Sequence, residues 1–461
     1  MTFSSFLIIL LISLDTSFKK FKYNKMISLA SMSGKKEEKN ETVNLPAAKK
    51  SSSIPWLAVL ALGMGMLVYG IAESYGPVAA ISSIIPSKFS YLGFGLPYIA
   101  GGVGSLLAGL MTDKLGRRNS FLTVASMIIL GVAIFLAFPT NTIALILSFI
   151  LIGMAAIGLE TPIITAISEA VPAKWRGNIE VVVQNFGNLG VALVFIPALL
   201  GFSAAQSDLA YGILFIAPLM AMLMGYWGVR ESLPWISAKE GSKTEIKKAW
   251  ENVDKGHVES VAPTSPLWFR FIFITVIGIV QDVAFVWITY DVAYYYFSST
   301  VADVVPVIGG ITMMIVGISF GIFLAHKFSR KSATTFSYGL LVALWAVLWI
   351  YVDITKSASG LLLLALMTIL FVPTELTWGT RAMLTPELFK TEQRGTYVSI
   401  VRTLVWIITG LITMILSYYV LPFNISSAII MVIFITGFLL ALAWQIRGFE
   451  TAGKSLSGLD L

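Results

Sequence analysis

The sequence predicts an all-α membrane protein, with 12 transmembrane helices in two pseudo-symmetric six-helix bundles and both termini in the cytoplasm. The first observation is composition: 57% of the 461 residues are hydrophobic and 12% are charged, whereas a soluble domain carries about 25% charged residues. The second is that apolar runs of about 18 residues or more, enough to cross a bilayer, recur along the chain. The third is the distribution of basic residues among the loops.

The apolar runs define two sets of six expected spans. The first set is 56–85, 91–111, 119–138, 142–168, 178–201 and 209–229. The second set is 267–296, 304–325, 334–352, 359–383, 396–420 and 424–446. Each is expected to be a helix, because a chain in lipid must satisfy its backbone hydrogen bonds internally.

Basic residues gather in the loops on one side of these spans. That side holds Lys114, Arg117, Arg118, Lys174, Arg176, Lys327, Arg330, Lys331, Lys390 and Arg394. The other side holds only Lys88 and Lys356. An excess of Lys and Arg marks cytoplasmic loops, so both chain ends are expected in the cytoplasm. The net charge of +7 then reflects topology, and no nucleic-acid partner is expected.

Polar segments divide the chain into five parts. They are a cytoplasmic tail at 1–53, expected to be disordered, a first bundle at 54–229, a cytoplasmic central loop at 230–266, a second bundle at 267–447 and a cytoplasmic C-terminal tail at 448–461. The sequence contains no cysteine, which excludes disulfides, thiolate metal sites and cysteine nucleophiles.

The two bundles repeat each other in sequence. SEAVPAKWRG ends the fourth span and PELFKTEQRG ends the tenth. The distance along the chain from Glu169 to Glu387 is the same as that from Arg176 to Arg394. Parallel repeats with a binding site between them near the middle of the membrane are typical of transporters.

One loop between the second and third spans carries a familiar motif, GLMTDKLGRR. Its glycines permit a tight turn, and its acid can cap the next helix. The loop resembles the signature loop of the major facilitator superfamily. RESLPWI after the sixth span and FETAGKSL after the twelfth are similar to motifs of sugar porters, whose proton-symporter relatives include phosphate symporters and vesicle-type transporters. The resemblance covers about residues 56–456.

The resemblance implies a plasma-membrane protein whose two bundles tilt around a central cavity. It also implies charged inner loops that gate the cavity and latch the outward-open state. The expected gating and latch residues are Gly109, Asp113, Gly116, Arg117, Arg118, Glu169, Arg176, Glu387 and Arg394. The alternative for these residues is loop solvation and topology alone.

The acidic residues within the spans include Glu73, Glu160, Asp282 and Glu375. A carboxylate at the bilayer centre costs about 2.5–3.5 kcal/mol on insertion scales, so each needs an explanation. Asp282 opens DVAF, which resembles the D-I-A-F of phosphate symporters, and Glu73 resembles the first acid of their D-x-Y-D. Desolvation favours a neutral carboxyl group, so Asp282 and Glu73 are the expected proton-coupling residues. The alternative is a structural acid hydrogen-bonded to a neighbouring helix; Glu375 matches no family motif.

Five residues are expected to bind substrate: Gln184, Arg402, Glu160, Tyr290 and Trp378. Glu160 lies in GLETP, which resembles a fourth-span motif of phosphate and metabolite symporters. Gln184 fits the R-G-x6-Q-x5-G pattern of sugar porters, in which the glutamine contacts substrate. For Gln184 the alternative is an interhelical hydrogen bond, and for the two aromatic residues it is packing or a place in an interfacial belt.

Two arginines also lie within expected spans. Arg402 occupies the repeat position of Gln184, and a buried guanidinium needs an anionic partner or water. It could pair with Glu73 or Asp282, hold an anionic substrate, or extend to the inner face. Arg381 is expected to extend to that face.

The sequence therefore predicts a secondary active transporter that moves a small polar metabolite, a sugar or an organic or phosphate anion, by proton-coupled alternating access. The alternatives are a non-transporting sensor on a transporter scaffold and a proton-coupled exporter. No enzyme is expected, since the only two histidines, His257 and His326, show no metal-ligand spacing. The expected partners are the solute, protons and lipid; the chain is expected to be a monomer without metal or cofactor.

Overall fold

The computed structural model describes residues 54–81, 90–138, 141–199, 204–240, 243–254 and 258–460, and the expected tail at 1–53 lies outside them. The regular structure within these ranges is helical, and one isolated parallel bridge joins Ser260 to Ser455. The all-α prediction is confirmed.

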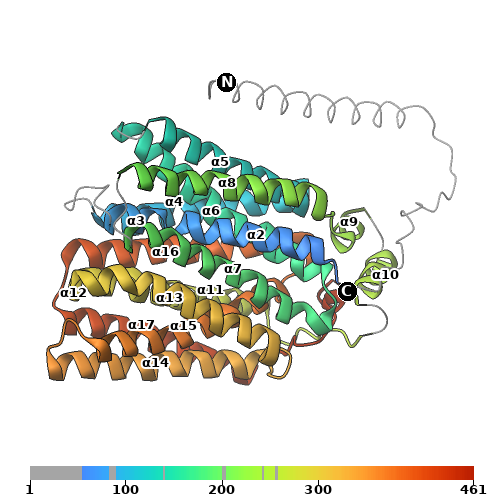
Figure 1. Cartoon of the computed structure of the whole chain (residues 1–461). Coiled ribbons are helices and arrows are strands. Elements are labelled where there is room, and N and C mark those ends of the chain that lie inside the picture. The colour runs from blue at the N-terminus through green and yellow to red at the C-terminus, as the bar shows by residue number, and fades with distance from the viewer. Residues whose placement is uncertain are drawn as a thin grey trace. The chain divides into compact units, whose positions relative to one another are not determined.

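The helices form two halves that are joined by two short helices (Figure 1). The N-half contains α2 (Trp56–Glu73), α3 (Tyr75–Ile81), α4 (Ser90–Leu115), α5 (Arg117–Ala137), α6 (Thr142–Ala170), α7 (Ala173–Leu199) and α8 (Ala204–Gly228). The connecting helices are α9 (Leu233–Glu240) and α10 (Lys243–Asp254). The C-half contains α11 (Leu267–Val286), α12 (Val292–Tyr296), α13 (Ser299–Ser319), α14 (Arg330–Thr355), α15 (Leu361–Glu387), α16 (Arg394–Tyr419) and α17 (Phe423–Arg447).

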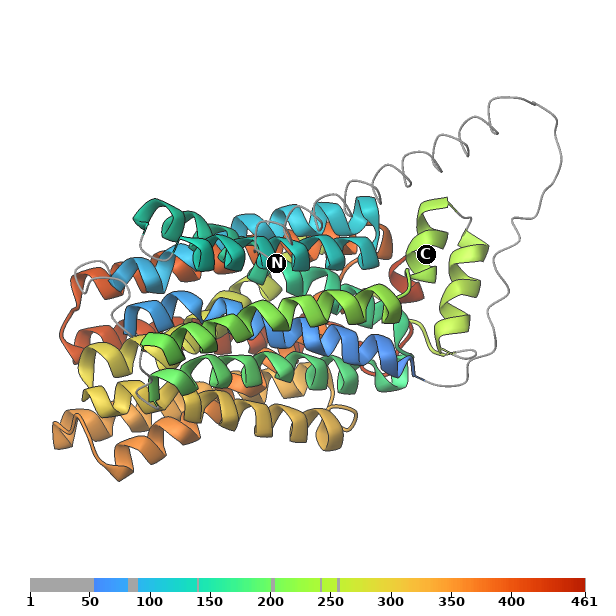
Figure 2. The same ribbon diagram turned by 45° about the horizontal axis from the view of Figure 1, so that its top comes forward.

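Eleven helices among the described residues are long and apolar enough to cross a membrane, and they overlap eleven of the twelve expected spans. The remaining span, 209–229, falls on α8 (Ala204–Gly228), of which the apolar part Ile216–Gly228 is described in full. The helices of both halves run roughly side by side, and α9 and α10 lie beyond one end of them, called the basal end (Figure 2).

Two spans are interrupted near their middle. The expected span 56–85 breaks at Ser74, between α2 and α3, and Glu73 is the last residue of α2. Pro77 explains the break, because it lacks the N–H that would bond to the carbonyl of Glu73. The span that begins with α11 continues through a π-helical turn, Trp287–Asp291, before α12. Such turns are rare and are frequent at functional sites.

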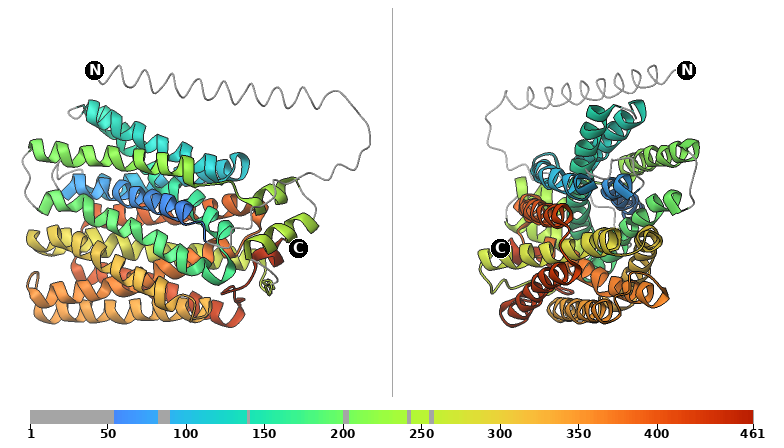
Figure 3. Two further views of the ribbon diagram at one scale, coloured as in Figure 1. Left: turned by 45° about the vertical axis from the view of Figure 1, so that its right-hand side comes forward. Right: turned by 90° about the vertical axis from the view of Figure 1, so that its left-hand side faces the viewer.

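The halves meet along two seams, seen end-on in Figure 3. On the first, Gly95 and Gly102 of α4 lie against α16. On the second, Gly310 and Gly317 of α13 lie against α7. The two glycines of each pair have the same spacing, so the second pair repeats the first in the other half of the chain. Small residues let membrane helices approach closely, so the sequence repeat builds two equivalent seams.

We predict that Gly102→Ala lowers the melting temperature, because it weakens the first seam. Gly379→Ala is the control and should not lower the melting temperature. A Cβ at Gly102 would lie 2.7 Å from Ile407 and 3.0 Å from the Thr403 carbonyl oxygen; at Gly379 the nearest atom, on Val181, is 3.5 Å away. Overpacking costs about 1–3 kcal/mol, partly offset by the better helix propensity of alanine, about 1 kcal/mol. Thermal unfolding in detergent measures both variants, and equal melting temperatures would contradict this account of the seam.

Candidate functional site

The deepest polar region lies between the two halves. A small central cavity, about 10 Å³ in volume, is lined by Tyr69, Glu73, Gly187, Asn188, Val191, Gln281, Asp282, Phe285, Trp378 and Trp406. Glu73 is 3% exposed, and its Oε1 has no hydrogen-bond partner among the described residues. Three of the expected site residues, Glu73, Asp282 and Trp378, thus share one cavity, to which each half contributes an acid.

Asp282 pairs with Arg381. The guanidinium donates from Nη2 to Asp282 Oδ1 over 3.1 Å and from Nη1 to Oδ2 over 3.4 Å. Both side chains are buried. The expectation that Arg381 extends to the inner face is therefore wrong: α15 turns the side chain toward α11, where a buried acid needs a cation.

Three of the expected substrate residues form one cluster. Arg402 of the C-half forms an ion pair with Glu160 of the N-half, and Gln184 Nε2 donates to Glu160 Oε1 over 3.2 Å. All three are buried. Of the alternatives left open for Arg402, pairing with an acid is observed, but the partner is Glu160 and neither Glu73 nor Asp282. Tyr69 lines the central cavity and interacts electrostatically with Glu73, Glu160 and Arg402, which connects this cluster to the cavity.

A second carboxylate crosses between the halves. Glu375 of α15 accepts hydrogen bonds from Asn185 and Asn188 of α7, over 2.9 and 2.6 Å. Neither asparagine is among the site residues that the sequence predicts. The signal available was QNFGN, a run with three amide side chains inside an apolar span.

Charged residues also gather at the basal end. Arg117 Nε and Nη2 donate to Glu169 Oε2 and Oε1 over 2.9 and 2.8 Å. Arg394 of the C-half donates to the same Glu169 Oε1 over 2.8 Å. Asp113, Arg117, Glu169 and Arg394 are called the basal cluster. The buried carboxylate of Glu169 therefore pairs with one arginine from each half.

Asp113 provides a second connection between the halves. It accepts hydrogen bonds from the backbone N–H of Gly395 and Thr396, over 3.1 and 2.7 Å, at the start of α16. An acid at a helix N-terminus satisfies free N–H groups and the helix dipole. Gly109, one turn earlier on α4, faces Ser399 of α16.

The other expected gating residues bind elsewhere at the basal end. Glu387 pairs with Arg330 over 3.2 Å within the C-half, as Glu169 pairs with Arg117 in the N-half. Arg176 lies 3.6 Å from Asp254 of α10 and donates to the Lys454 carbonyl. The two contacts of Arg176 connect the N-half to the central loop and to the C-terminal segment.

Two expected gating residues and one expected substrate residue have local roles. Gly116 has a φ of +96° and ends the turn between α4 and α5, a conformation that favours glycine. Arg118 donates to the Tyr226 carbonyl within the N-half. Tyr290 lies outside the central cavity: its hydroxyl is 2.9 Å from Ser74 Oγ, where it joins the π-helical turn to the break between α2 and α3.

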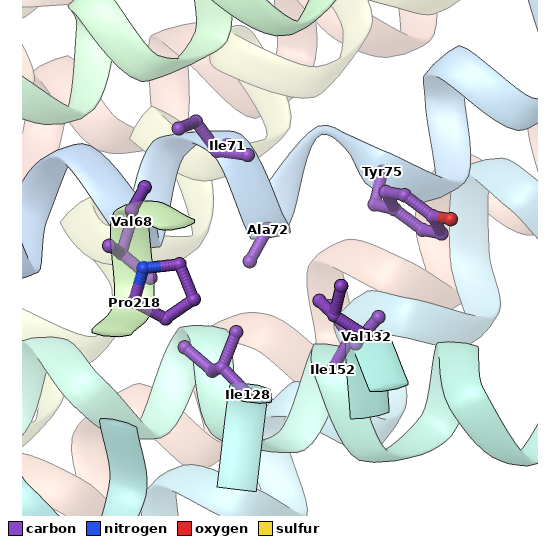
Figure 4. A pocket seen from close by; sticks show the side chains of 9 residues that line it. Val68, Ile71, Ala72, Tyr75, Ile128, Val132, Ile152 and Pro218 are labelled. Carbon is purple, nitrogen blue, oxygen red and sulfur yellow. The ribbon is translucent and has the colours of Figure 1, made fainter. Parts of the chain in front are cut away.

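A separate apolar pocket in the N-half is a poor candidate site (Figure 4). Its volume equals that of the central cavity, about 10 Å³, but its lining is aliphatic apart from Tyr75, so it offers almost no polar group to a solute. Among the described residues, no group of three or more His, Asp or Glu side chains is placed to hold a metal ion. The central cavity and its flanking clusters are therefore the candidate site.

A sequence profile of the Major Facilitator Superfamily matches residues 6–195 and 56–407. The chain belongs to the major facilitator superfamily. Among known proteins, the chain is 23% identical to the glucose transporter GlcP of Staphylococcus epidermidis, over 78% of this chain and 85% of that protein. It is 27% identical to the facilitated trehalose transporter Tret1 of Drosophila willistoni, over 41% of this chain and 24% of that protein.

Solved structures of the superfamily share the fold. The proton:xylose symporter XylE of E. coli, bound to 6-bromo-6-deoxy-D-glucose, superimposes with a TM-score of 0.68 at 19% identity, over 88% of this chain and 98% of that chain. The human organic anion transporter MFSD10 gives 0.62 at 15% identity, over 84% and 98%. The chain is a multi-pass membrane protein of this superfamily, and the similar proteins are transporters, in agreement with the transport function that the sequence predicts.

We predict that Glu169→Gln opens the basal end. The change leaves Arg117 and Arg394 without their shared carboxylate, and breaking a buried ion pair costs about 3–5 kcal/mol. Because the sequence has no cysteine, Ser399→Cys provides a single reporter in the first seam. We expect faster maleimide labelling of Ser399→Cys in the Glu169→Gln background.

The matched control is Glu259→Gln. Glu259 also pairs with a basic residue, Lys454 at 2.8 Å, but its side chain is 77% exposed, and exposed pairs contribute only about 0–1 kcal/mol. Labelling should match that of the reporter alone. A Glu169→Gln protein that labels no faster than this control would show that the basal cluster does not hold the seam closed.

Proposed function

We propose that the protein is a proton-coupled secondary transporter that works by alternating access, with 12 spans and both termini in the cytoplasm. The observation that carries the proposal is the central cavity, where each half contributes a buried acid, Glu73 or Asp282. A buried carboxylate between two halves can gain or lose a proton as the cavity faces opposite sides. The basal cluster and the Asp113 contacts then hold the cytoplasmic side closed.

A sugar or a similar neutral polar solute is the substrate class that we favour. Glucose, trehalose and xylose transporters are among the similar proteins. Trp378 and Trp406 supply flat surfaces in the cavity, and Asn188 and Gln281 supply amides. An organic or phosphate anion is the second candidate, since Arg381 and Arg402 are both present. An anion would have to displace Asp282 or Glu160 from these arginines, which disfavours it.

Protonation of Asp282 gives a direct route from proton binding to movement. The Asp282–Arg381 pair is balanced only while the acid is ionised. A proton on Asp282 leaves Arg381 as an uncompensated buried cation, which favours any rearrangement that gives Arg381 another partner. Glu73, with one free oxygen, is the second proton-coupling residue that we propose. Gln184, Glu160, Arg402 and Trp378 are proposed to orient the solute.

The proposal includes the plasma membrane as location and a single chain as the transport unit. A sensor without transport and an exporter are the alternatives. Net accumulation of solute separates the transporter from the sensor, and the direction in which an imposed gradient drives the solute separates import from export.

We predict that one of a panel of labelled hexoses, pentoses, phosphate, monocarboxylates and dicarboxylates accumulates in proteoliposomes only under an imposed proton gradient. Asp282→Asn should still exchange this solute across the membrane but should no longer concentrate it. The reason is that the amide cannot carry the proton. The measurement is uptake and counterflow of the same solute with each variant.

Asp353→Asn is the control. Asp353 also pairs with a neighbouring base, Lys356, but its side chain is 45% exposed and lies outside the central cavity, so accumulation should be unchanged. The double variant Asp282→Asn with Arg381→Gln tests whether any loss of folding comes from the unpaired guanidinium. Normal accumulation by Asp282→Asn would exclude Asp282 as a coupling site.

A further inference from the structure

Glu375 is a buried acid to which the proposed transport cycle gives no role. It lies on α15, 1% exposed, and each of its carboxylate oxygens accepts a hydrogen bond from an asparagine of α7. Asn188 also donates to Asn185 Oδ1 over 2.9 Å. The contact therefore joins the C-half to the N-half through neutral donors alone.

The repeat supplies a direct comparison for this contact. Glu160 and Glu375 occupy equivalent positions in the two halves. They are separated by as many residues as Gly102 and Gly317, which are equivalent glycines of the two seams. Glu160 reaches from α6 to Arg402 of α16, and Glu375 reaches from α15 to α7. Each is thus a carboxylate that crosses to the other half, where α16 and α7 are repeat counterparts. One carboxylate meets a guanidinium, whereas the other meets two amides.

No cation faces Glu375 from the described parts of the helices packed against it, α14 and α11 included: the side chains that interact with its carboxyl group are those of Asn185 and Asn188. On α7 the nearest titratable residue is Glu180, an acid, and on α13 it is Asp303, several turns of helix away from Gly317. On α15 itself the nearest is Arg381, which pairs with Asp282. An ionised carboxylate buried without a cation is costly, so the charge balance at this contact is incomplete.

The helices are packed tightly around Glu375. A Cβ added to Gly317 of α13 would collide with both Asn185 and the Glu375 carboxylate, so the seam is closed there. A protonated Glu375 would also keep its hydrogen bonds. Asn188 Oδ1 has no partner among the described residues and can accept the carboxyl proton.

We propose that Glu375 is a further proton-binding site, besides Asp282 and Glu73, where the proton supplies the positive charge that Arg402 supplies at the equivalent contact. Asn188 also lines the central cavity, so a solute that hydrogen-bonds to Asn188 competes with Glu375 for its donor. Loss of a donor favours the neutral acid, which links solute binding to proton binding. This link rests on the proposed transport function, whereas proton binding by Glu375 does not.

The test is infrared spectroscopy of the full chain in lipid, without solute or gradient, as the pH is varied. A protonated carboxyl group has a carbonyl absorption that an ionised one lacks. We expect this band at neutral pH in the wild type. In Glu375→Gln the band should lose the intensity that one carboxyl group contributes, and in Glu375→Asp it should shift in frequency. Glu259→Gln, an exposed acid, should leave the band unchanged.

Asn188→Ala keeps the test decisive if Glu375→Gln fails to fold. Removing this donor should make the Glu375 band persist to higher pH. Identical wild-type and Glu375→Gln bands, or an Asn188→Ala band lost at the same pH as in the wild type, would overturn the proposal. So would a Glu375 signal that responds to sodium chloride at constant pH, because the site would then take sodium. If the Glu375 band is present but the protein takes up no solute, the transport proposal is refuted and the proposal of a proton site at Glu375 is not.

Discussion

The structure depends on the need to balance charges that lie within membrane-spanning helices. A carboxylate or guanidinium there has no water to solvate it, so it must meet a partner on another helix. Several of these partners belong to the opposite half: Arg402 meets Glu160, Arg394 meets Glu169, and Asn188 meets Glu375. Buried charge therefore positions the two halves relative to each other, which apolar packing in lipid does only weakly.

The same constraint makes the arrangement suitable for transport. Each contact between the halves can be broken only if its charges find new partners or are neutralised by a proton. Glycines along both seams keep the backbones close, so a change of partner moves a whole half and not a single side chain. The structure has its basal end closed by the Arg394–Glu169 pair. Its central cavity is small, and Glu73 Oε1 there has no hydrogen-bond partner among the described residues.

The sequence predicted the fold class and much of the candidate site because these depend on local patterns. Apolar runs gave eleven of the spans, and the repeat between the two halves placed Arg402 at the depth of Gln184. Partner choice was not predictable, since it depends on how helices far apart in sequence pack together. Arg381 shows this most clearly: near the end of α15, it was expected to extend to the inner face, but the rotation of the helix directs it to Asp282. The sequence gives no signal for the π-helical turn at Trp287. QNFGN does show that amide side chains lie within a span, but it does not show that Asn185 and Asn188 bind Glu375.

The most direct test of the central claim is a pair of distances measured between the halves in lipid nanodiscs at neutral and acidic pH. Spin labels on exposed positions Lys174 and Lys327 report on the basal end, and labels on Phe138 and Ser359 report on the opposite end. The account predicts two populations, in which one distance lengthens as the other shortens, with their ratio changed by pH. Distances that stay constant with pH, or that lengthen together, would contradict it.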